Sequence, residues 1–327
     1  MARALARLLA AGLLAAGIAA AFAAGWGHAR FTGPGPSATP TTVVIPEGTG
    51  LAGIARRLDA AGVIGGRRAR AVFRLGVRLH GRAGALRAGE YRFPARASMA
   101  RAMAVLVHAD PVTHSLTVAE GRTTAEVVAK VKKADALAGP VTRDPDEGTL
   151  LPETYHYRRG TARDTLLKRM RRARADLLDR LWPERAPGLP YDSRREAVIL
   201  ASIVEKETAV PGERPHIAGV FVNRLEKGMR LQSDPTVIYG ITRGERPLDR
   251  PLTKTDLETA TRWNTYTRDG LPPTPICNPG RAAIKAALHP RDTDDLYFVA
   301  DSDGDGHAFA ETLEAHNANV RAWRENQ

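Results

Sequence analysis

Cysteine is almost absent, since Cys277 is the only one in 327 residues. An intramolecular disulfide is therefore excluded, and no group of cysteines and histidines has the spacing of a zinc site, so we predict no metal centre. The chain also lacks a G-x-S-x-G motif, a phosphate-binding loop and a dinucleotide-binding glycine motif. These absences argue against serine hydrolases and nucleotide-dependent enzymes, and we expect no cofactor.

Acidic residues are too few to balance the basic ones. There are 36 Asp and Glu against 48 Lys and Arg, which gives a formal net charge of +12. Such a charge indicates an acidic partner: nucleic acid, an anionic membrane surface or an acidic polymer. Aromatic residues make up only 6% of the chain, and no zinc-finger spacing, RNP-type motif or basic zipper is present. Nucleic acid is therefore not an expected partner.

The longest stretch without charge lies near the N-terminus. Arg3 and Arg7 are followed by 17 uncharged residues, and the apolar run extends to Trp26. This asymmetry predicts a single-pass anchor, with residues 8–26 in the cytoplasmic membrane and the following chain on the periplasmic or extracytoplasmic side. A signal-peptidase site at 21–23 is the alternative, and it also leaves the rest of the chain outside the cytoplasm.

Strand-like and helix-like runs alternate after the anchor, which predicts an α+β protein. Residues 43–58 and 116–131 are alike: each has a β-rich run, a Glu-Gly turn and a helix with apolar residues three and four apart. Residues 88–107 form a further strand–turn–helix unit. The first pair is either a set of ordinary packing units or a small polymer-binding module.

The chain divides by composition into a short series of parts. We expect a cytoplasmic stub and transmembrane anchor in 1–30, a linker rich in Pro, Gly and Ser in 31–42, a small α+β module in 43–113, and a larger α+β region in 114–327 whose core is about 190–327. A chain of this length and hydrophobic content can bury more than one core.

A helix with a strongly basic surface is predicted over 161–181. Its apolar residues form one stripe, and six Arg and Lys residues lie mostly off that stripe. The basic surface is either a solvated face or a contact for anionic lipid or an acidic wall polymer.

An acidic turn is predicted near the C-terminus. Residues 296–300 and 307–309 read as a hairpin, with a final helix from Thr312. The turn, with Asp301, Asp303 and Asp305, mimics the start of a calcium loop. Position twelve of such a loop would be Thr312 rather than Glu, and strands rather than helices flank it, so we predict a plain hairpin turn.

Two glutamates end the apolar stretch "VILASIVEKETAVP", residues 198–211. Glu205 and Glu207 are about 200° apart around a helix and cannot share one face. Glu207 continues the bulky line Ile199–Ile203, which we expect to face the core, so partial desolvation would keep it protonated for use as a general acid. We expect Glu205 to be solvated. A charged helix end without chemistry is the alternative for both.

Other acids and polar loops extend the choice of site. Glu153 lies among aromatic residues, Asp234 precedes a proline in a polar loop, and the loop-rich stretch 262–280 carries further polar side chains. By elimination, the sequence favours acid/base chemistry on a neutral or acidic substrate outside the cytoplasm, and polysaccharide is the natural candidate.

Several long stretches resemble the endolytic murein transglycosylase family of the MltG or YceG-like type. They are "LASIVEKETAV", "VFVNRLEKGMRLQSDPTVIYG", "NTYTRDGLPPTPICNPG", "AAIKAALHP" and "LYFVADSDGDGHAFAETLEAHN". The resemblance covers the anchor and about residues 41–327, and it is clearest after Arg195.

The resemblance implies a membrane-anchored enzyme with a LysM-like first module. It implies internal cleavage of nascent peptidoglycan strands between N-acetylmuramic acid and N-acetylglucosamine, without water, leaving 1,6-anhydromuramic ends. Cell-wall synthases are candidate partners. A lysozyme-like hydrolase and a noncatalytic wall-binding scaffold remain the alternatives.

The second Glu of Glu-Lys-Glu is the family's catalytic residue, so the resemblance assigns catalysis to Glu207. A single carboxyl group can suffice, because the C6 hydroxyl of the muramic sugar takes the place of water. We further expect six residues to bind substrate or place the acid: Glu153, Gln232, Asp234, Asn264, Thr265 and Tyr266.

Overall fold

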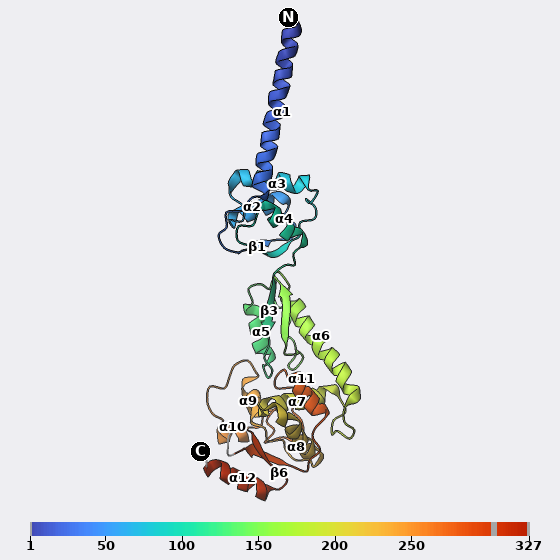
Figure 1. Cartoon of the computed structure of the whole chain (residues 1–327). Coiled ribbons are helices and arrows are strands. Elements are labelled where there is room, and N and C mark those ends of the chain that lie inside the picture. The colour runs from blue at the N-terminus through green and yellow to red at the C-terminus, as the bar shows by residue number, and fades with distance from the viewer. Residues whose placement is uncertain (1, 302–305, 326–327) are drawn as a thin grey trace. The chain divides into compact units, whose positions relative to one another are not determined.

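The computed structural model describes residues 2–301 and 306–325 (Figure 1). It divides into two compact units, Met1–His114 and Ser115–Gln327, each with its own core. Helices and short strands alternate in both, so the predicted α+β class is confirmed. Asp303 and Asp305 of the predicted acidic turn lie outside the described residues.

The first unit begins with a long apolar helix, α1 (Ala2–Thr32). It is long and apolar enough to cross a membrane, and its most apolar part is not buried against the rest of the protein. Leu8, Leu13 and Phe22 are among its exposed side chains. Exposed leucine and phenylalanine side chains on an apolar helix of this length are consistent with a single-pass membrane anchor.

The predicted linker 31–42 is wrong at both of its ends. Helix α1 runs through Thr32, and Phe31 is buried so closely against α3 that a Cβ on Gly76 would lie 2.3 Å from its ring. At the other end, strand β1 already begins at Thr41. Burial of an aromatic ring at the end of α1 therefore ties the helix to the folded module, and only 33–40 connects the two elements.

In the folded part of the first unit, two helices lie along the chain between two strands that pair with each other, and a third helix follows. Its elements are β1 (Thr41–Ile45), α2 (Leu51–Ala60), α3 (Gly66–Leu79), β2 (Gly89–Phe93) and α4 (Met99–His108). Strand β1 pairs antiparallel with β2, with Thr41 opposite Phe93 and Ile45 opposite Gly89. Val43, Ile45, Tyr91 and Phe93 point from this ribbon into the core.

The second unit contains two further two-stranded sheets and most of the helices. Its elements are β3 (Thr113–Thr117, which spans the boundary), α5 (Thr124–Lys133), β4 (Thr154–Arg158), α6 (Arg163–Leu181), η1 (Trp182–Glu184), α7 (Arg194–Glu207), η2 (Pro211–Glu213), α8 (Arg214–Glu226), α9 (Asp234–Thr242), α10 (Lys254–Glu258), α11 (Arg281–Leu288), β5 (Tyr297–Ala300), β6 (His307–Ala310) and α12 (Leu313–Glu325). Strand β3 pairs with β4, and β5 pairs with β6.

Two sequence predictions at the edges of this unit are confirmed. The capping box of Thr123 and Glu126 starts α5, with both of its hydrogen bonds formed. The C-terminal hairpin is antiparallel, with Tyr297 opposite Ala310 and Ala300 opposite His307.

Helix α7 is the centre of the second unit. A capping box of Ser193 and Glu196 begins it, and residues 197–204 are all buried. We expected the Ile199–Ile203 line to face the core. In the structure every side of the helix is covered, because α7 packs against both α8 and α11 (Figure 1). A helix that is apolar all round belongs in a core, and its last turn carries both glutamates into protein surroundings.

Candidate active site

Glu207 is the last residue of α7, and its side chain is partly exposed while its carboxyl group lies largely among protein atoms. Burial raises its pKa, the neighbouring charge of Asp234 adds to the rise, and a hydrogen bond from Ser233 opposes it. The resulting pKa is about 7, against 4.5 for a free glutamate. The negative end of the helix dipole acts in the same direction as burial. Near neutral pH this carboxyl group therefore holds a proton much of the time and can donate it.

Ser233 is the closest partner of Glu207. Its hydroxyl donates a hydrogen bond to Glu207 Oε1. Ser233 occupies the N-cap position of α9, yet its side chain caps no backbone N–H of that helix. A serine at this position ordinarily accepts such a bond, so the hydroxyl is used for the glutamate instead. The hydrogen bond fixes the orientation of a carboxyl group that sits at a helix end.

The backbone before Ser233 is held in an unusual conformation. Gln232 has φ of 54°, in the left-handed region that residues with a side chain rarely adopt. Thr265 holds it there: its carbonyl accepts from Gln232 N at 3.2 Å, and its hydroxyl accepts from Ser233 N at 3.0 Å. The side chain of Gln232 is left exposed. Strained backbone that is fixed by its surroundings is common at functional sites.

Arg224 of α8 fixes the other side of this loop. Its guanidinium is buried and donates to the carbonyls of Leu296, Arg230 and Leu231 at 2.6, 3.2 and 2.9 Å. It also lies close enough to Glu207 to lower the pKa of that carboxyl group. Arg224 also donates to the side-chain Oε1 of Gln232 at 3.4 Å, so it fixes this loop and provides a permanent positive charge near the site.

A second carboxylate lies beside Glu207. Asp234, the first residue of α9, is exposed, and its Oδ1 accepts from the Tyr266 hydroxyl at 2.6 Å. Burial, and then this hydrogen bond, raise the pKa of the Tyr266 phenol. Asp234 and Tyr266 therefore form a polar pair next to the glutamate, where both can contact a ligand.

Two residues that we expected to bind substrate are buried instead. Asn264 is fully buried, and its amide donates to the carbonyls of Asp256, Leu257 and Thr259 at 3.3, 2.9 and 2.7 Å. Thr265 is 2% exposed. Their polar atoms are used to hold the loop and α9 in place, so we assign them positioning roles.

Glu153 lies apart from this cluster. Its carboxylate forms an ion pair with Arg281 at 3.3 Å, with both side chains about half exposed. No described contact joins it to Glu207 or to the loop around Ser233. Five of the seven predicted site residues therefore lie together: Glu207, Gln232, Asp234, Thr265 and Tyr266. Asn264 is joined to them because its side-chain oxygen accepts a hydrogen bond from Tyr266 N, and Glu153 lies outside the cluster.

Glu205 is not solvated, contrary to our expectation. Its side chain is only 4% exposed; it accepts from Gly280 N at 2.7 Å and pairs with Arg214 at 3.2 Å. Burial, with the nearby charge of Glu120 as a smaller cause, raises its pKa. Because α7 is covered on all sides, the Glu205 face meets the N-terminus of α11. Glu205 therefore has a structural position, and only Lys206 of the three residues is exposed.

A further polar cluster, formed by Glu213, His307 and Thr208, was not predicted from the sequence. Glu213 binds His307, with its Oε1 accepting from the backbone N–H and its Oε2 within 2.7 Å of the ring Nδ1, and it also accepts from Thr208 at 3.0 Å. Burial tends to raise the pKa of Glu213, but these hydrogen bonds outweigh it, so the pKa is lowered. The group joins β6 to the residue after Glu207.

Ser233, Arg224 and the Glu213–His307 pair had only one signal in the sequence. Ser233 and Arg224 fall within the stretch that resembles the family, next to residues that we did select. Ser233 lies 26 residues from Glu207 in the sequence, and Arg224 lies 17 residues from it. Helix periodicity carries no information on contacts between residues so far apart in the sequence.

Comparison with known proteins gives consistent matches. The YceG-like family model matches residues 43–322. An endolytic murein transglycosylase of Bacillus subtilis (strain 168) is 39% identical over 176 residues, which are 54% of this chain and 47% of that protein. One from Streptococcus pneumoniae (strain D39) is 33% identical over 178 residues, 53% of this chain and 31% of that protein.

Solved structures agree with the sequence matches. The crystal structure of a YceG-like protein from Listeria monocytogenes superposes with a TM-score of 0.53 at 28% identity, covering 86% of this chain and 99% of that one. The chain spans about a third to a half of the length of the curated relatives it matches. Since the family model matches far more than half of the sequence, the chain belongs to the YceG-like family.

Proposed function

We propose that the chain is an endolytic murein transglycosylase, a lyase that cuts peptidoglycan strands internally at the bond from N-acetylmuramic acid to N-acetylglucosamine. The observation that carries this proposal is Glu207, a largely buried carboxyl group that accepts a hydrogen bond from Ser233 and whose pKa is raised to about 7. The names of the relatives point to the same activity.

The first step needs an acid. Protonated Glu207 donates its proton to the glycosidic oxygen while the bond from that oxygen to C1 of the muramic sugar breaks. The leaving sugar departs with a hydroxyl group, and positive charge develops at C1. The carboxylate left behind is stabilised by the Ser233 hydroxyl and by the positive charge of Arg224.

The second step uses the same group as a base. Glu207 takes the proton from the C6 hydroxyl of the muramic sugar, and that oxygen bonds to C1 to close the 1,6-anhydro ring. The glutamate is protonated again, and no water is consumed. General acid/base assistance contributes roughly 10²–10⁴ in rate.

Hydrolysis is a second candidate because of Asp234. Glycosidases that use water pair two carboxyl groups, one as acid and one as base or nucleophile. Asp234 is exposed and close enough to raise the pKa of Glu207. In our proposal it positions sugar hydroxyls together with Tyr266 and Gln232, and the products distinguish the two reactions.

The remaining parts follow from the same proposal. We propose a LysM-like glycan-binding module in 43–113, supported by strands β1 and β2 that pair across α2 and α3, and a catalytic region in 114–327. With α1 as a single-pass anchor, both lie on the periplasmic or extracytoplasmic side. Cell-wall synthases are the proposed partners, because the substrate is newly made glycan.

The experiment compares two glutamates that each end a helix. In Glu207→Gln, formation of anhydro-ended fragments from purified glycan strands is expected to fall by at least 10²-fold, while the protein stays folded. Glu226, the exposed last residue of α8, supplies the matched control Glu226→Gln, which is expected to keep normal activity. Full activity of Glu207→Gln would remove Glu207 from the mechanism.

A further inference from the structure

Three adjoining hollows lie beside α6 in the second unit. Their volumes are about 240, 320 and 560 Å³. Lys168 and Arg171 line both the first and the second hollow, and Arg174 lines both the second and the third. We call the three together the α6 trough. It begins at the start of α6 and ends at Val198 of α7 and Trp263.

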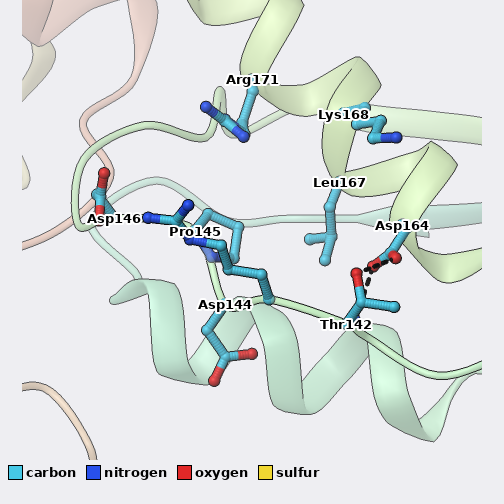
Figure 2. A pocket seen from close by; sticks show the side chains of 9 residues that line it. Thr142, Asp144, Pro145, Asp146, Asp164, Leu167, Lys168 and Arg171 are labelled. Carbon is cyan, nitrogen blue, oxygen red and sulfur yellow. Dashed lines mark hydrogen bonds between the residues drawn. The ribbon is translucent and has the colours of Figure 1, made fainter.

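The trough has a row of cations along one wall. Lys168, Arg171 and Arg174 follow at three-residue intervals, which is about 4.5 Å of rise per step on a helix. Figure 2 shows Asp164, Lys168 and Arg171 projecting from α6 beside the loop that carries Asp146. Lys168 and Arg171 are both exposed, and Lys168 lies near enough to Asp164 to lower the pKa of that carboxyl group.

Arg174 of this row and a further guanidinium group, that of Arg195, line the 560 Å³ hollow and are fixed in orientation. Arg174 Nε donates to the Gly148 carbonyl at 3.0 Å, and Arg195 Nη2 donates to the Pro273 carbonyl at 2.8 Å. Their remaining N–H groups make none of the described hydrogen bonds. Fixed guanidinium groups with free donors suit carboxylates, which they can bind through two parallel hydrogen bonds.

The acidic residues of the trough mostly have other partners. Asp164 accepts from the Thr142 hydroxyl at 2.5 Å, and Glu147 accepts from the Thr124 hydroxyl at 3.0 Å and from the Tyr239 hydroxyl at 3.3 Å. Asp144 is 3.9 Å from Lys132. Asp146 remains as an exposed carboxylate. Bonds from neutral hydroxyl groups leave a carboxylate charged, and Asp164 also interacts with the charge of Lys168. Basic residues nevertheless outnumber acidic ones in the lining, with Arg143, Lys168, Arg171, Arg172, Arg174 and Arg195 against Asp144, Asp146, Glu147 and Asp164, so the trough has a net positive charge.

We propose that the α6 trough binds the carboxylate-bearing peptide stems of the glycan strand, and so places the strand relative to Glu207. The proposal rests on the proposed function. Helix α9 connects the two places: it begins at Asp234, beside Glu207, and its fifth following residue, Tyr239, lines the 560 Å³ hollow. That separation is about 7.5 Å along the helix, within reach of a peptide attached to a neighbouring sugar.

The lining of the trough favours this ligand over other anions. The wall at the far end is formed by Trp263, Tyr239, Thr274 and Pro275, which offer apolar surface and hydroxyl groups. Such a wall suits a peptide better than a polymer whose only recognition groups are phosphates.

The test measures cleavage of two forms of the same substrate by the full chain. One is glycan strands with their peptides, and the other is the same strands after an amidase has removed the peptides. For the double variant Lys168→Glu and Arg171→Glu, kcat/KM on peptide-bearing strands relative to peptide-free strands is expected to fall about tenfold, mainly through KM. The matched control is Arg180→Glu on α6, an exposed residue outside the trough, for which the ratio stays at the wild-type value.

Binding of soluble peptide-bearing glycan fragments is measured in parallel on the same proteins, with about tenfold weaker binding expected for the double variant and not for the control. An unchanged ratio together with unchanged binding would overturn the proposal. Weaker binding of polyglycerol phosphate with unchanged murein binding would overturn it in favour of a phosphate polymer. A wild-type chain that cleaves neither strand would instead contradict the proposed function, and the binding assay would still decide about the trough.

Discussion

The hydroxyl group of Ser233, at the start of α9, donates a hydrogen bond to the carboxyl group of Glu207, at the end of α7. This bond favours the charged form of the glutamate, while burial and the charge of Asp234 favour the protonated form. The balance gives a pKa of about 7, which suits a group that must first give and then accept a proton. Substitutions on either side of this balance should therefore move the pH dependence in opposite directions.

Ser233→Ala is expected to move the alkaline limb of the pH profile upward. The wild-type rate depends on protonated Glu207, so kcat/KM should fall as pH rises through about 7. Removal of the hydroxyl takes away a bond that lowers the pKa, and the fall should then begin at higher pH, with a lower maximal rate because the carboxyl group is less well oriented. A pH profile of kcat/KM measures this, and a limb that stays in place or moves down would contradict it.

Asp234→Asn is expected to move the same limb downward. The Asp234 charge raises the pKa of Glu207, and asparagine removes that charge while its oxygen can still accept from the Tyr266 hydroxyl. Titration of the two variants against wild type in one buffer series gives the comparison. If both limbs shifted in the same direction, the assignment of these two contacts would be wrong.

Glu207→Gln is expected to stabilise the protein at neutral and alkaline pH. The pKa of Glu207 is higher in the folded state than the 4.5 of a free glutamate, so the folded state binds more protons between these values, and the free energy of unfolding decreases as pH rises from about 4.5 through about 7. Glutamine does not ionise, so this pH-dependent loss of stability is absent in the variant. The gain should reach roughly 3 kcal/mol above pH 7 and vanish below about pH 4. Urea unfolding at several pH values measures it, and a gain that is independent of pH would refute the account.

Glu205→Gln is expected to destabilise the protein without changing its products. The buried Glu205 carboxylate pairs with Arg214, whose side chain is only 10% exposed, and holds the N-terminus of α11 through Gly280. Loss of its charge leaves Arg214 with the more distant Glu120, at a cost of about 1 to 3 kcal/mol. Thermal unfolding measures the change in stability, and product analysis of the soluble fraction shows whether the chemistry has changed. A variant with normal stability and altered products would give Glu205 a chemical role.

Periodicity in the sequence was sufficient to place α5, α6 and α7, but it did not predict α8 or α9, which carry Arg224 and Asp234. The capping residues of α5, the apolar stripe of α6 and the end of α7 before Pro211 all follow from local spacing, and the structure confirms them. Periodicity also separated Glu205 from Glu207 around the helix. It could not show that α7 is covered on every side, because that depends on α8 and α11, which pack against it from later in the chain.

The partners of Glu207 could not be predicted from the sequence. Ser233 is 26 residues away and would ordinarily be assigned to capping α9, and Arg224 would ordinarily be assigned to a solvated helix face. Asn264 was selected because it is polar and lies in a loop, yet its amide is needed to hold that loop together. Polar residues in loops serve ligands and backbone alike, and only their hydrogen-bond partners separate the two uses.

The mass of the products tests the central claim most directly. Purified glycan strands are treated with the full chain, and the fragments are measured by mass spectrometry, with Glu207→Gln as the inactive control. If Glu207 acts alone as acid and then as base, the fragments carry 1,6-anhydromuramic ends and together have the same mass as the parent strand. Fragments that have gained one water per cut would show that the chain is a hydrolase and would contradict the account.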